Sequence, residues 1–370
     1  MKKVAYLAID VHASNCVLGH MDFDGTFLGT RRFPTSERHI IQALKAVKAK
    51  EKYLALEESN LAYWAAQVAR PYVTEVISSD PRENALIYRS ANKRDKVDTH
   101  KLCRLLRLGE LNRVYHPEND DRAIFKAAVQ HYIDLRDQQV VLKNKIKARY
   151  RHWGVIEVAG QAVYGIRTRD DYLQRMKHLH IRNQLHRLYC LMDETEAMQK
   201  RALRAMKQLG RKYPEIKEFE KMPGIGEILS HIFDAFIQTP YRFANKRKLW
   251  RYCRLGITDR TSDGKPLGYK RLDRSGVSEL KALSYRAWLC AMAGDNEVRR
   301  FYSRSLSHTS DHVHARLNTQ RKILAVMYGM WKRGDAYRPQ LFLDSPQMLS
   351  LIHISEPTRP TRASRMPSSA

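Results

Sequence analysis

Four acidic residues within the first hundred positions have the spacing expected of a metal-centred site. Asp95 and Asp98 lie three residues apart in the basic segment 92–108, NKRDKVDTHKLCRLLRL. At the opening turn of a helix this spacing puts both carboxylates on one face, where they repel each other unless a cation or basic partners compensate them. Asp10 ends the apolar run VAYLAID, and Glu57 ends YLALE. Acids on three such elements predict one nuclease-like site for a divalent ion, although a solvated, salt-bridged helix start explains the Asp95–Asp98 pair equally well.

Two serines in a basic segment are candidate nucleophiles. Residues 245–288 are dense in Lys and Arg, interleaved with aromatic residues, and contain Ser262 in TSDGK and Ser275 in DRSG. Neighbouring cations would stabilise the charge that develops when a serine hydroxyl attacks a phosphodiester. Most loop serines are turn residues instead, so both readings stay open for each serine.

The overall charge indicates a polyanionic partner. The 370 residues include 66 Lys and Arg against 39 Asp and Glu, a net charge of +27 that is spread along the chain. Nucleic acid is the favoured partner, and a membrane surface is the competing one. No apolar run approaches the roughly 18 residues needed to span a bilayer. The five cysteines are widely spaced and lack a CxxC pair, so we expect a soluble protein of a reducing cytoplasm, without disulfides or structural zinc.

Three segments could contact phosphates. The first is the basic outer face of a long predicted helix, and the second is PGIG, which resembles the hairpin of a helix-hairpin-helix motif. The third is the basic segment 245–288. A solvated face and plain helix–turn–helix packing are the structural alternatives for the first two. The candidate nucleic-acid contacts are Lys143, Lys147, Arg151, Gly224, Gly226, Lys248, Arg251, Lys265, Lys270 and Arg271.

The elements that must position the acids alternate between strand and helix. An Asp-Gly turn signal in FDGT predicts a hairpin between the second and third strands. We expect strands over 3–10, 15–22, 26–33, 52–58 and 73–80, and helices after Ser36, over 61–72 and from Pro81. Three antiparallel strands followed by alternating helices and strands is the plan of a ribonuclease-H-like α/β domain, with a mixed sheet whose reacting groups gather at strand carboxyl ends.

Residues 121–212 are predicted to form a helical coiled coil. Apolar residues recur on three- and four-residue steps from Phe125 to Ile146 and from Ile181 to Leu209, with Gln139 as a polar interruption. A self-folded antiparallel hairpin and a pairing between protomers both agree with this pattern. The second is favoured, because a lone hairpin buries few apolar faces.

The expected division of the chain has four parts. A catalytic α/β domain over 1–120 precedes the coiled coil over 121–212, and a mainly helical domain with the serine segment follows over 213–348. Residues 349–370 lack periodicity, and LSLIHISEPTR is similar to a translated sequencing-library adapter. We expect this tail to be disordered and to have replaced the natural C-terminus.

Taken in order, these motifs resemble the insertion-sequence-110 family of transposases, the RNA-guided bridge recombinases. The resemblance covers residues 1 to about 345 and rests on AIDVH, LALEES, KRDKVDTHKL, the coiled coil, MPGIGEIL and LGITDRTSDGK. It implies a RuvC-like N-terminal domain with an Asp-Glu-Asp-Asp tetrad that binds Mg2+. Matched by motif, the tetrad is Asp10, Glu57, Asp95 and Asp98, with Glu58 as a rival for the second position.

The resemblance also implies a serine nucleophile and partners. The family's serine loop is Ser-Gly-Gly-Lys-like and forms a covalent phosphoserine link to DNA; here TSDGK matches it at Ser262, with Asp in place of the first Gly. The downstream run departs further, since it reads RLDRSG and leaves Ser275 as a second candidate. Element ends and target DNA, a guide RNA and a homodimer or homotetramer are implied, with a nucleoid-associated prokaryotic location. The alternatives are a RuvC-like nuclease in which water attacks, and a non-catalytic nucleic-acid-binding scaffold.

Overall fold

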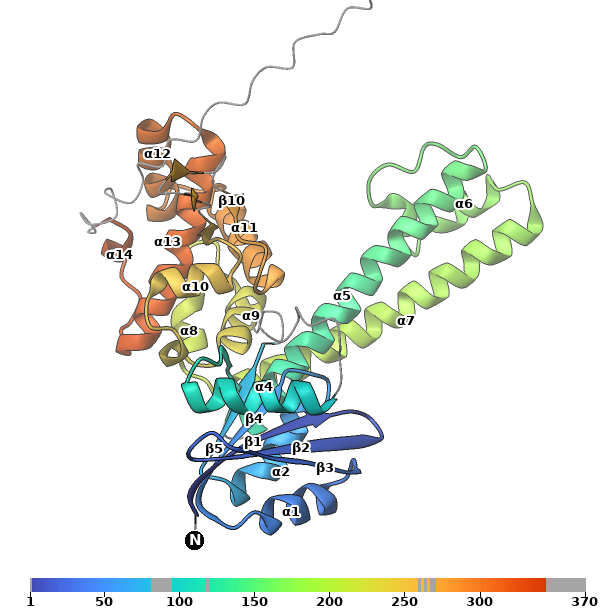
Figure 1. Cartoon of the computed structure of the whole chain (residues 1–370). Helices are drawn as coiled ribbons and strands as arrows, with labels where there is room; N and C mark the ends of the chain where they lie inside the picture. Colours follow the sequence, from blue (N-terminus) through green and yellow to red (C-terminus); the bar gives the residue numbers. More distant parts are fainter. Residues whose placement is uncertain are drawn as a thin grey trace, which may run out of the picture. The chain divides into compact units, whose positions relative to one another are not determined.

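The computed structural model describes residues 2–80, 95–117, 120–258, 261–262, 265–266 and 271–343. For residues 2–3, 95–97, 261–262, 265–266 and 343 it describes the backbone alone. The expected helix from Pro81 and the tail over 349–370 lie outside the described residues. The chain divides into two compact units, Met1–Glu118 and Asn119–Ala370 (Figure 1).

The first unit is built on a mixed six-stranded sheet. Its strands are β1 (Lys2–Val11), β2 (Asn15–Asp22), β3 (Phe27–Pro34), β4 (Ala49–Glu57), β5 (Glu75–Ser79) and β6 (Arg113–Val114). They lie in the order β3-β2-β1-β4-β5-β6, in which β1, β4 and β5 are parallel and the other pairs are antiparallel. The ribonuclease-H-like plan predicted from the sequence is therefore confirmed; the short edge strand β6 was not predicted.

Helices cover both faces of this sheet (Figure 1). They are α1 (Glu37–Ala46), α2 (Ala62–Ala69), the 3-10 turn η1 (Arg70–Tyr72) and α4 (Asp95–Leu108). Because side chains alternate along a strand, Leu7 and Ile9 of β1 pack against α1 and α2, whereas Ala8 packs against α4. Ser36 caps α1 as predicted, since its hydroxyl accepts a hydrogen bond from the backbone N–H of His39 at 3.3 Å.

The second unit begins with a long helical hairpin. Helices α5 (Asp120–His152) and α7 (Leu179–Gly210) run antiparallel, joined by the 3-10 turn η2 (Ala162–Tyr164) and α6 (Arg169–Gln174). The polar interruption at Gln139 is satisfied, because its side-chain amide donates to the carbonyl of Met192 at 2.6 Å. The preference for pairing these apolar faces between protomers is wrong, because the buried positions of α5 and α7 pack against each other within one chain.

The remaining helices form a second core together with the base of this hairpin. They are α8 (Glu215–Glu220), α9 (Glu227–Ile237), the 3-10 turn η3 (Pro240–Arg242), α10 (Lys246–Tyr252), α11 (Ser278–Ala291), α12 (Glu297–Thr309), α13 (His312–Arg333) and α14 (Gln340–Leu343). Two short antiparallel pairs lie between α10 and α11: β7 (Ile257–Thr258) with β10 (Arg271–Leu272), and β8 (Thr261–Ser262) with β9 (Lys265–Pro266). Helices α8 and α9 flank PGIG, which agrees with both interpretations of this segment, a helix-hairpin-helix-like motif and plain helix–turn–helix packing.

All five cysteines are free; Cys16, Cys103 and Cys253 are buried, and Cys190 and Cys290 are exposed. In the part of the chain that the structure describes, every helix is too short or too polar to cross a membrane.

Candidate active site and nucleic-acid interface

Asp10 and Glu57 lie side by side at the carboxyl ends of two neighbouring parallel strands. The register of β1 and β4 pairs Ile9 with Leu56, so Asp10 and Glu57 follow at the next step. Both share the face of Ala8 and Ala55, which pack against α4. The side chain of Asp10 is 26% exposed, so a carboxylate at this edge can be reached by a substrate.

Helix α4 brings a third acid to the same edge. A Cβ built on Gly19 would lie 2.9 Å from Thr99, and Gly19 is the register partner of Ala8. At the other end of α4, the Nε of Arg107 donates to the carbonyl of Phe23 at 3.0 Å, in the β2–β3 turn. The N-terminus of α4 therefore points towards the strand ends that carry the two acids.

Asp98 lies one residue before Thr99, in the first turn of α4. Its Oδ1 atom is buried and has no hydrogen-bond partner among the described residues. A buried carboxylate oxygen is costly unless a cation or donor compensates it. This orphaned oxygen and the carboxylate donor set suit a hard divalent cation.

The structure describes only part of the predicted tetrad. Asp95 is the first residue of α4, but its side chain lies outside the described residues. Among the side chains that are described, no three His, Cys, Asp or Glu residues are close enough to hold a metal ion. Asp10, Glu57 and the N-terminal turn of α4 thus lie at one edge of the sheet, but the described side chains of Asp10, Glu57 and Asp98 do not by themselves form a group that could hold a metal ion.

The surroundings of Glu58 differ from those of Glu57. Glu58 follows the end of β4 and pairs with His116, whose Nε2 lies 2.7 Å from Oε2 of Glu58. The His116 ring in turn stacks on Tyr63, with ring centroids 5.7 Å apart. Glu58 is thereby engaged with a different part of the unit, while Glu57 lies on the face that α4 covers.

Two polar neighbours of the acids were missed from the sequence. The Nε2 of His12 lies 3.0 Å from Oδ2 of Asp10, just beyond the end of β1. Ser79, which is fully buried, is the register partner of Glu57 at the end of β5. His12 could have been singled out from the sequence as a neighbour of Asp10, because it follows that acid by two residues in AIDVH.

The two candidate serines have different surroundings. Ser262 lies in β8, opposite Lys265 of β9 in the register; the side chains of both lie outside the described residues. The backbone N–H of Ser275 donates to Oδ1 of Asp273 at 2.8 Å, and its hydroxyl donates to the same oxygen at 2.5 Å. The Ser275 hydroxyl is therefore engaged in a local turn.

The predicted phosphate contacts on the hairpin are partly engaged within the chain. The amine of Lys147 donates to the carbonyl of Gly160 at 2.7 Å, and both Lys143 and Lys147 lie over the ring of Tyr164, 5.4 and 5.0 Å from its centroid. Arg151 is exposed. Of the three, Arg151 is thus the most available to a phosphate.

The two glycines of PGIG differ in their environment. Gly224 has a φ of +84°, and a Cβ built on it would lie 2.1 Å from the carbonyl oxygen of Ala287 in α11. Gly226 precedes α9 as its N-cap, and a Cβ there would meet nothing within 4 Å. Gly224 is required by close packing against α11, whereas Gly226 leaves the helix start open to an approaching group.

The basic segment before α11 offers further exposed cations. Lys248 and Arg271 are exposed, and the Nε of Arg251 donates to Oδ2 of Asp273 at 2.9 Å. The backbone of Lys265 lies in β9, and its side chain lies outside the described residues, as does all of Lys270. Three of these five predicted contacts are therefore exposed, and one of the three, Arg251, takes part in a salt bridge.

Comparison with protein families agrees with this arrangement. Residues 7–149 match the transposase model for the DEDD domain of IS110 elements, and residues 216–303 match the model described as "Transposase IS116/IS110/IS902 family". The first match contains the four acids, and the second contains PGIG and both candidate serines. No curated protein matches the chain.

A mixed sheet with acids at its carboxyl edge is shared by ribonuclease-H-like enzymes that act on nucleic acids, and the first match places this chain among the DEDD transposases. The two matches belong to the same family and together cover more than half of the chain. The chain belongs to the IS110 family of transposases, and it is a DNA transposase or recombinase. Transposases of the DEDD type generally depend on a metal ion.

Proposed function

We propose that this transposase cuts and rejoins DNA at element ends and at a target, with Ser262 as the nucleophile and Asp10, Glu57, Asp95 and Asp98 as ligands of Mg2+. The observation that carries the proposal is the approach of three elements to one edge of the sheet. Asp10 and Glu57 end neighbouring strands there, and α4 points towards them its first turn, which carries Asp98 with its buried, unpartnered Oδ1.

The residues of the chain can be assigned to separate tasks. Asp10, Glu57, Asp95 and Asp98 would hold the metal ion, which when bound supplies positive charge to the scissile phosphate. Lys265, opposite Ser262 in the register, would balance charge that develops during attack. His12, hydrogen-bonded to Asp10, would orient that carboxylate.

The covalent step conserves the number of phosphodiester bonds. The hydroxyl oxygen of Ser262 forms a bond to phosphorus, the bond to the leaving deoxyribose oxygen breaks, and the proton lost by serine balances the one gained by the released hydroxyl. Attack of another DNA hydroxyl on the phosphoserine reverses these changes and frees the serine. Strands are thereby exchanged without an external energy source.

We further propose that a structured RNA selects the DNA sites and that protomers assemble as a dimer or tetramer. The net charge of +27 supports extensive backbone contact. If base pairing with RNA reads the sequence, the protein needs mainly phosphate contacts. Such a reaction would take place at the chromosome, in agreement with the expected cytoplasmic, nucleoid-associated location.

Trapping of a protein–DNA adduct tests the chemistry. The full chain is incubated with Mg2+, RNA transcribed from the DNA flanking its gene, and labelled element-end DNA, and is then denatured. We expect a covalent adduct that Ser262→Ala abolishes and that the matched control Ser275→Ala retains. Metal-dependent cleavage unchanged by Ser262→Ala would instead support a RuvC-like nuclease that uses water, and a chain without cleavage that still binds DNA would support a non-catalytic scaffold.

A further inference from the structure

The tip of the α5–α7 hairpin, residues 149–182, presents an aromatic and basic surface that the transposition chemistry does not use. Trp153, Ile156, Ile166 and Leu179 are exposed there by 40%, 74%, 72% and 64%, respectively. Exposed apolar side chains gathered within one short region mark interaction surfaces. The tip is therefore a candidate binding surface for another molecule.

The exposed ring of Trp153 has a fixed position. Its backbone N–H donates to the carbonyl of Tyr150 at 3.1 Å, just after α5 ends. The ring centroid of Trp153 lies 5.5 Å from that of His152 and 4.9 Å from that of His178, at steep interplanar angles. These edge contacts support the indole ring from two sides.

The tip is a rigid platform because it has a core of its own. Tyr150 and Tyr189 are fully buried, and their hydroxyl oxygens lie 3.2 Å apart. The Tyr189 hydroxyl also donates to the carbonyl of Val163 at 2.7 Å. Val158, Leu173 and Met176 complete this cluster. Because this core already orders the tip, a ligand that stacks on Trp153 would not have to order the loop beneath the ring.

The charge around Trp153 selects the kind of partner. The tip carries seven Lys and Arg against three Asp and Glu, together with three histidines. Arg169 and Arg175 are paired with Asp193 and Glu157. Four other cations of the tip make no ion pair or hydrogen bond with any residue of the described range 120–258: Arg149, Arg151, Arg167 and Lys177. A surface of this sign favours a polyanion over a second copy of a chain that is itself strongly basic.

We infer that the hairpin tip binds RNA, with an unpaired base stacked on Trp153 and the flanking phosphates held by Arg149, Arg151 and Lys177. Aromatic side chains recognise bases only where these are unstacked, as in RNA loops and bulges. Duplex DNA keeps its bases inside the helix and offers no such face. The inference rests on the proposed RNA-guided function and assigns the RNA a docking place on the chain.

Binding of defined nucleic acids to the full chain tests this inference. The probes are an RNA hairpin with an unpaired loop, the same stem as a fully paired RNA, and a DNA duplex of equal length. We expect Trp153→Ala to weaken binding of the looped RNA by roughly 5- to 100-fold and to change binding of either duplex by less than about twofold. Trp153→Phe should keep most of the affinity, because phenylalanine also stacks.

Two further variants separate stacking from charge and from general damage. Arg149→Gln combined with Arg151→Gln should reduce the slope of log affinity against log salt by about 1.4, as expected for two lost contacts to a single strand. Met198→Ala is the matched control, since Met198 is also an exposed apolar residue (46%) of α7 but lies about 28 Å along the helix from Leu179. It should bind every probe as the native chain does.

The outcomes are distinguishable. Equal weakening of looped RNA and duplexes by Trp153→Ala, or no weakening at all, would overturn the assignment of the tip. If the looped RNA binds no better than duplex DNA to the native chain, RNA guidance itself fails, whereas the Ser262 adduct would still test the strand-transfer chemistry. Photo-cross-links from a thiouridine in the loop should fall within residues 149–153 or 177–180, and cross-links elsewhere would contradict the inference.

Discussion

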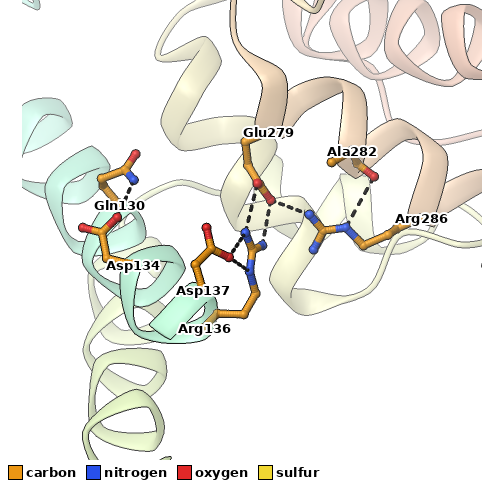
Figure 2. Close-up of polar contacts among 7 residues, drawn as sticks. All are labelled: Gln130, Asp134, Arg136, Asp137, Glu279, Ala282 and Arg286. Carbon is orange, nitrogen blue, oxygen red and sulfur yellow. Dashed lines mark hydrogen bonds and ion pairs between the residues drawn. The ribbon is translucent and has the colours of Figure 1, made fainter. Parts of the chain in front are cut away.

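Arg136 and Glu279 form a bidentate ion pair that joins the helical hairpin to helix α11. Nη1 of Arg136 donates to Oε1 of Glu279 at 2.8 Å, and Nη2 donates to Oε2 at 3.1 Å (Figure 2). Arg286 of α11 donates to the same Oε1 at 2.6 Å. Because α11 follows directly on the segment with both candidate serines, this pair fixes the start of α11 against α5.

Replacement of Glu279 should destabilise the second unit. The hydrogen bond to Glu279 raises the pKa of Arg136, and the Arg136 and Glu279 side chains are only 22% and 16% exposed. Glu279→Gln removes the charge that both arginines face, so we expect a loss of about 1.5–3 kcal/mol in urea-induced unfolding. Asp137→Asn is the control, because Asp137 contacts Arg136 from an exposed position, and such a pair contributes at most about 1 kcal/mol. Equal effects of the two variants would contradict this account.

The glycines of PGIG provide a matched pair of substitutions. Gly224→Ala places a Cβ against the Ala287 carbonyl at a positive φ, so we expect a stability loss of roughly 2–4 kcal/mol. Gly226→Ala meets open space and should cost less than about 1 kcal/mol, while its methyl group hinders the approach of a phosphate to α9. Thermal unfolding and DNA affinity are measured for both variants. A stable Gly224→Ala chain, or undiminished DNA binding by Gly226→Ala, would count against the respective assignment.

The buried imidazole of His231 predicts a pH dependence of stability. Burial lowers the pKa of His231 below its ordinary 6.5, and the opposing influences are a hydrogen bond to the Glu227 carbonyl and the charges of Glu220 and Glu227. Since the unfolded chain then binds a proton that the folded chain does not, stability from this group is present above pH 6.5 and is lost as the pH falls below it. His231→Asn can keep the hydrogen bond without titrating, so its unfolding free energy should fall less between pH 7 and 5.5 than that of the native chain. The control His131→Asn, at an exposed position of α5, should follow the native chain; parallel curves for all three would exclude this role.

The sequence predicted those features that depend on neighbours along the chain. Apolar runs ended by Asp10 and Glu57 indicated strands and a reactive edge, and Ser36 indicated a helix start. The packing of Gly224 on Ala287 and the pairing of Glu58 with His116 could not be predicted, because each joins residues that are distant in sequence. The same holds for the hairpin, since a heptad pattern specifies a buried face but not the chain that covers it.

Asp98→Asn separates chemistry from binding. Asparagine keeps the size of the side chain but removes one negative charge from the proposed metal site, so we expect strand cleavage to fall by about a hundredfold or more, because even changes to residues around metal ligands cost roughly 10- to 100-fold. DNA affinity should stay within about twofold, because the carboxylate makes no favourable contact with phosphates. Cleavage of a labelled element end and gel-shift binding are measured on the same samples. Weaker binding with normal cleavage per bound complex would contradict the assignment.

The central claim is that acids from β1, β4 and α4 share one divalent ion, and cleavage of the protein backbone by bound iron tests it most directly. Fe2+ is substituted for Mg2+ in the full chain, and radicals generated with ascorbate and peroxide break the backbone near the ion. We predict breaks close to Asp10, Glu57 and Asp98 that excess Mg2+ suppresses and that Asp10→Asn abolishes. Breaks confined to other segments, or breaks at these positions that persist in Asp10→Asn, would contradict a shared metal site.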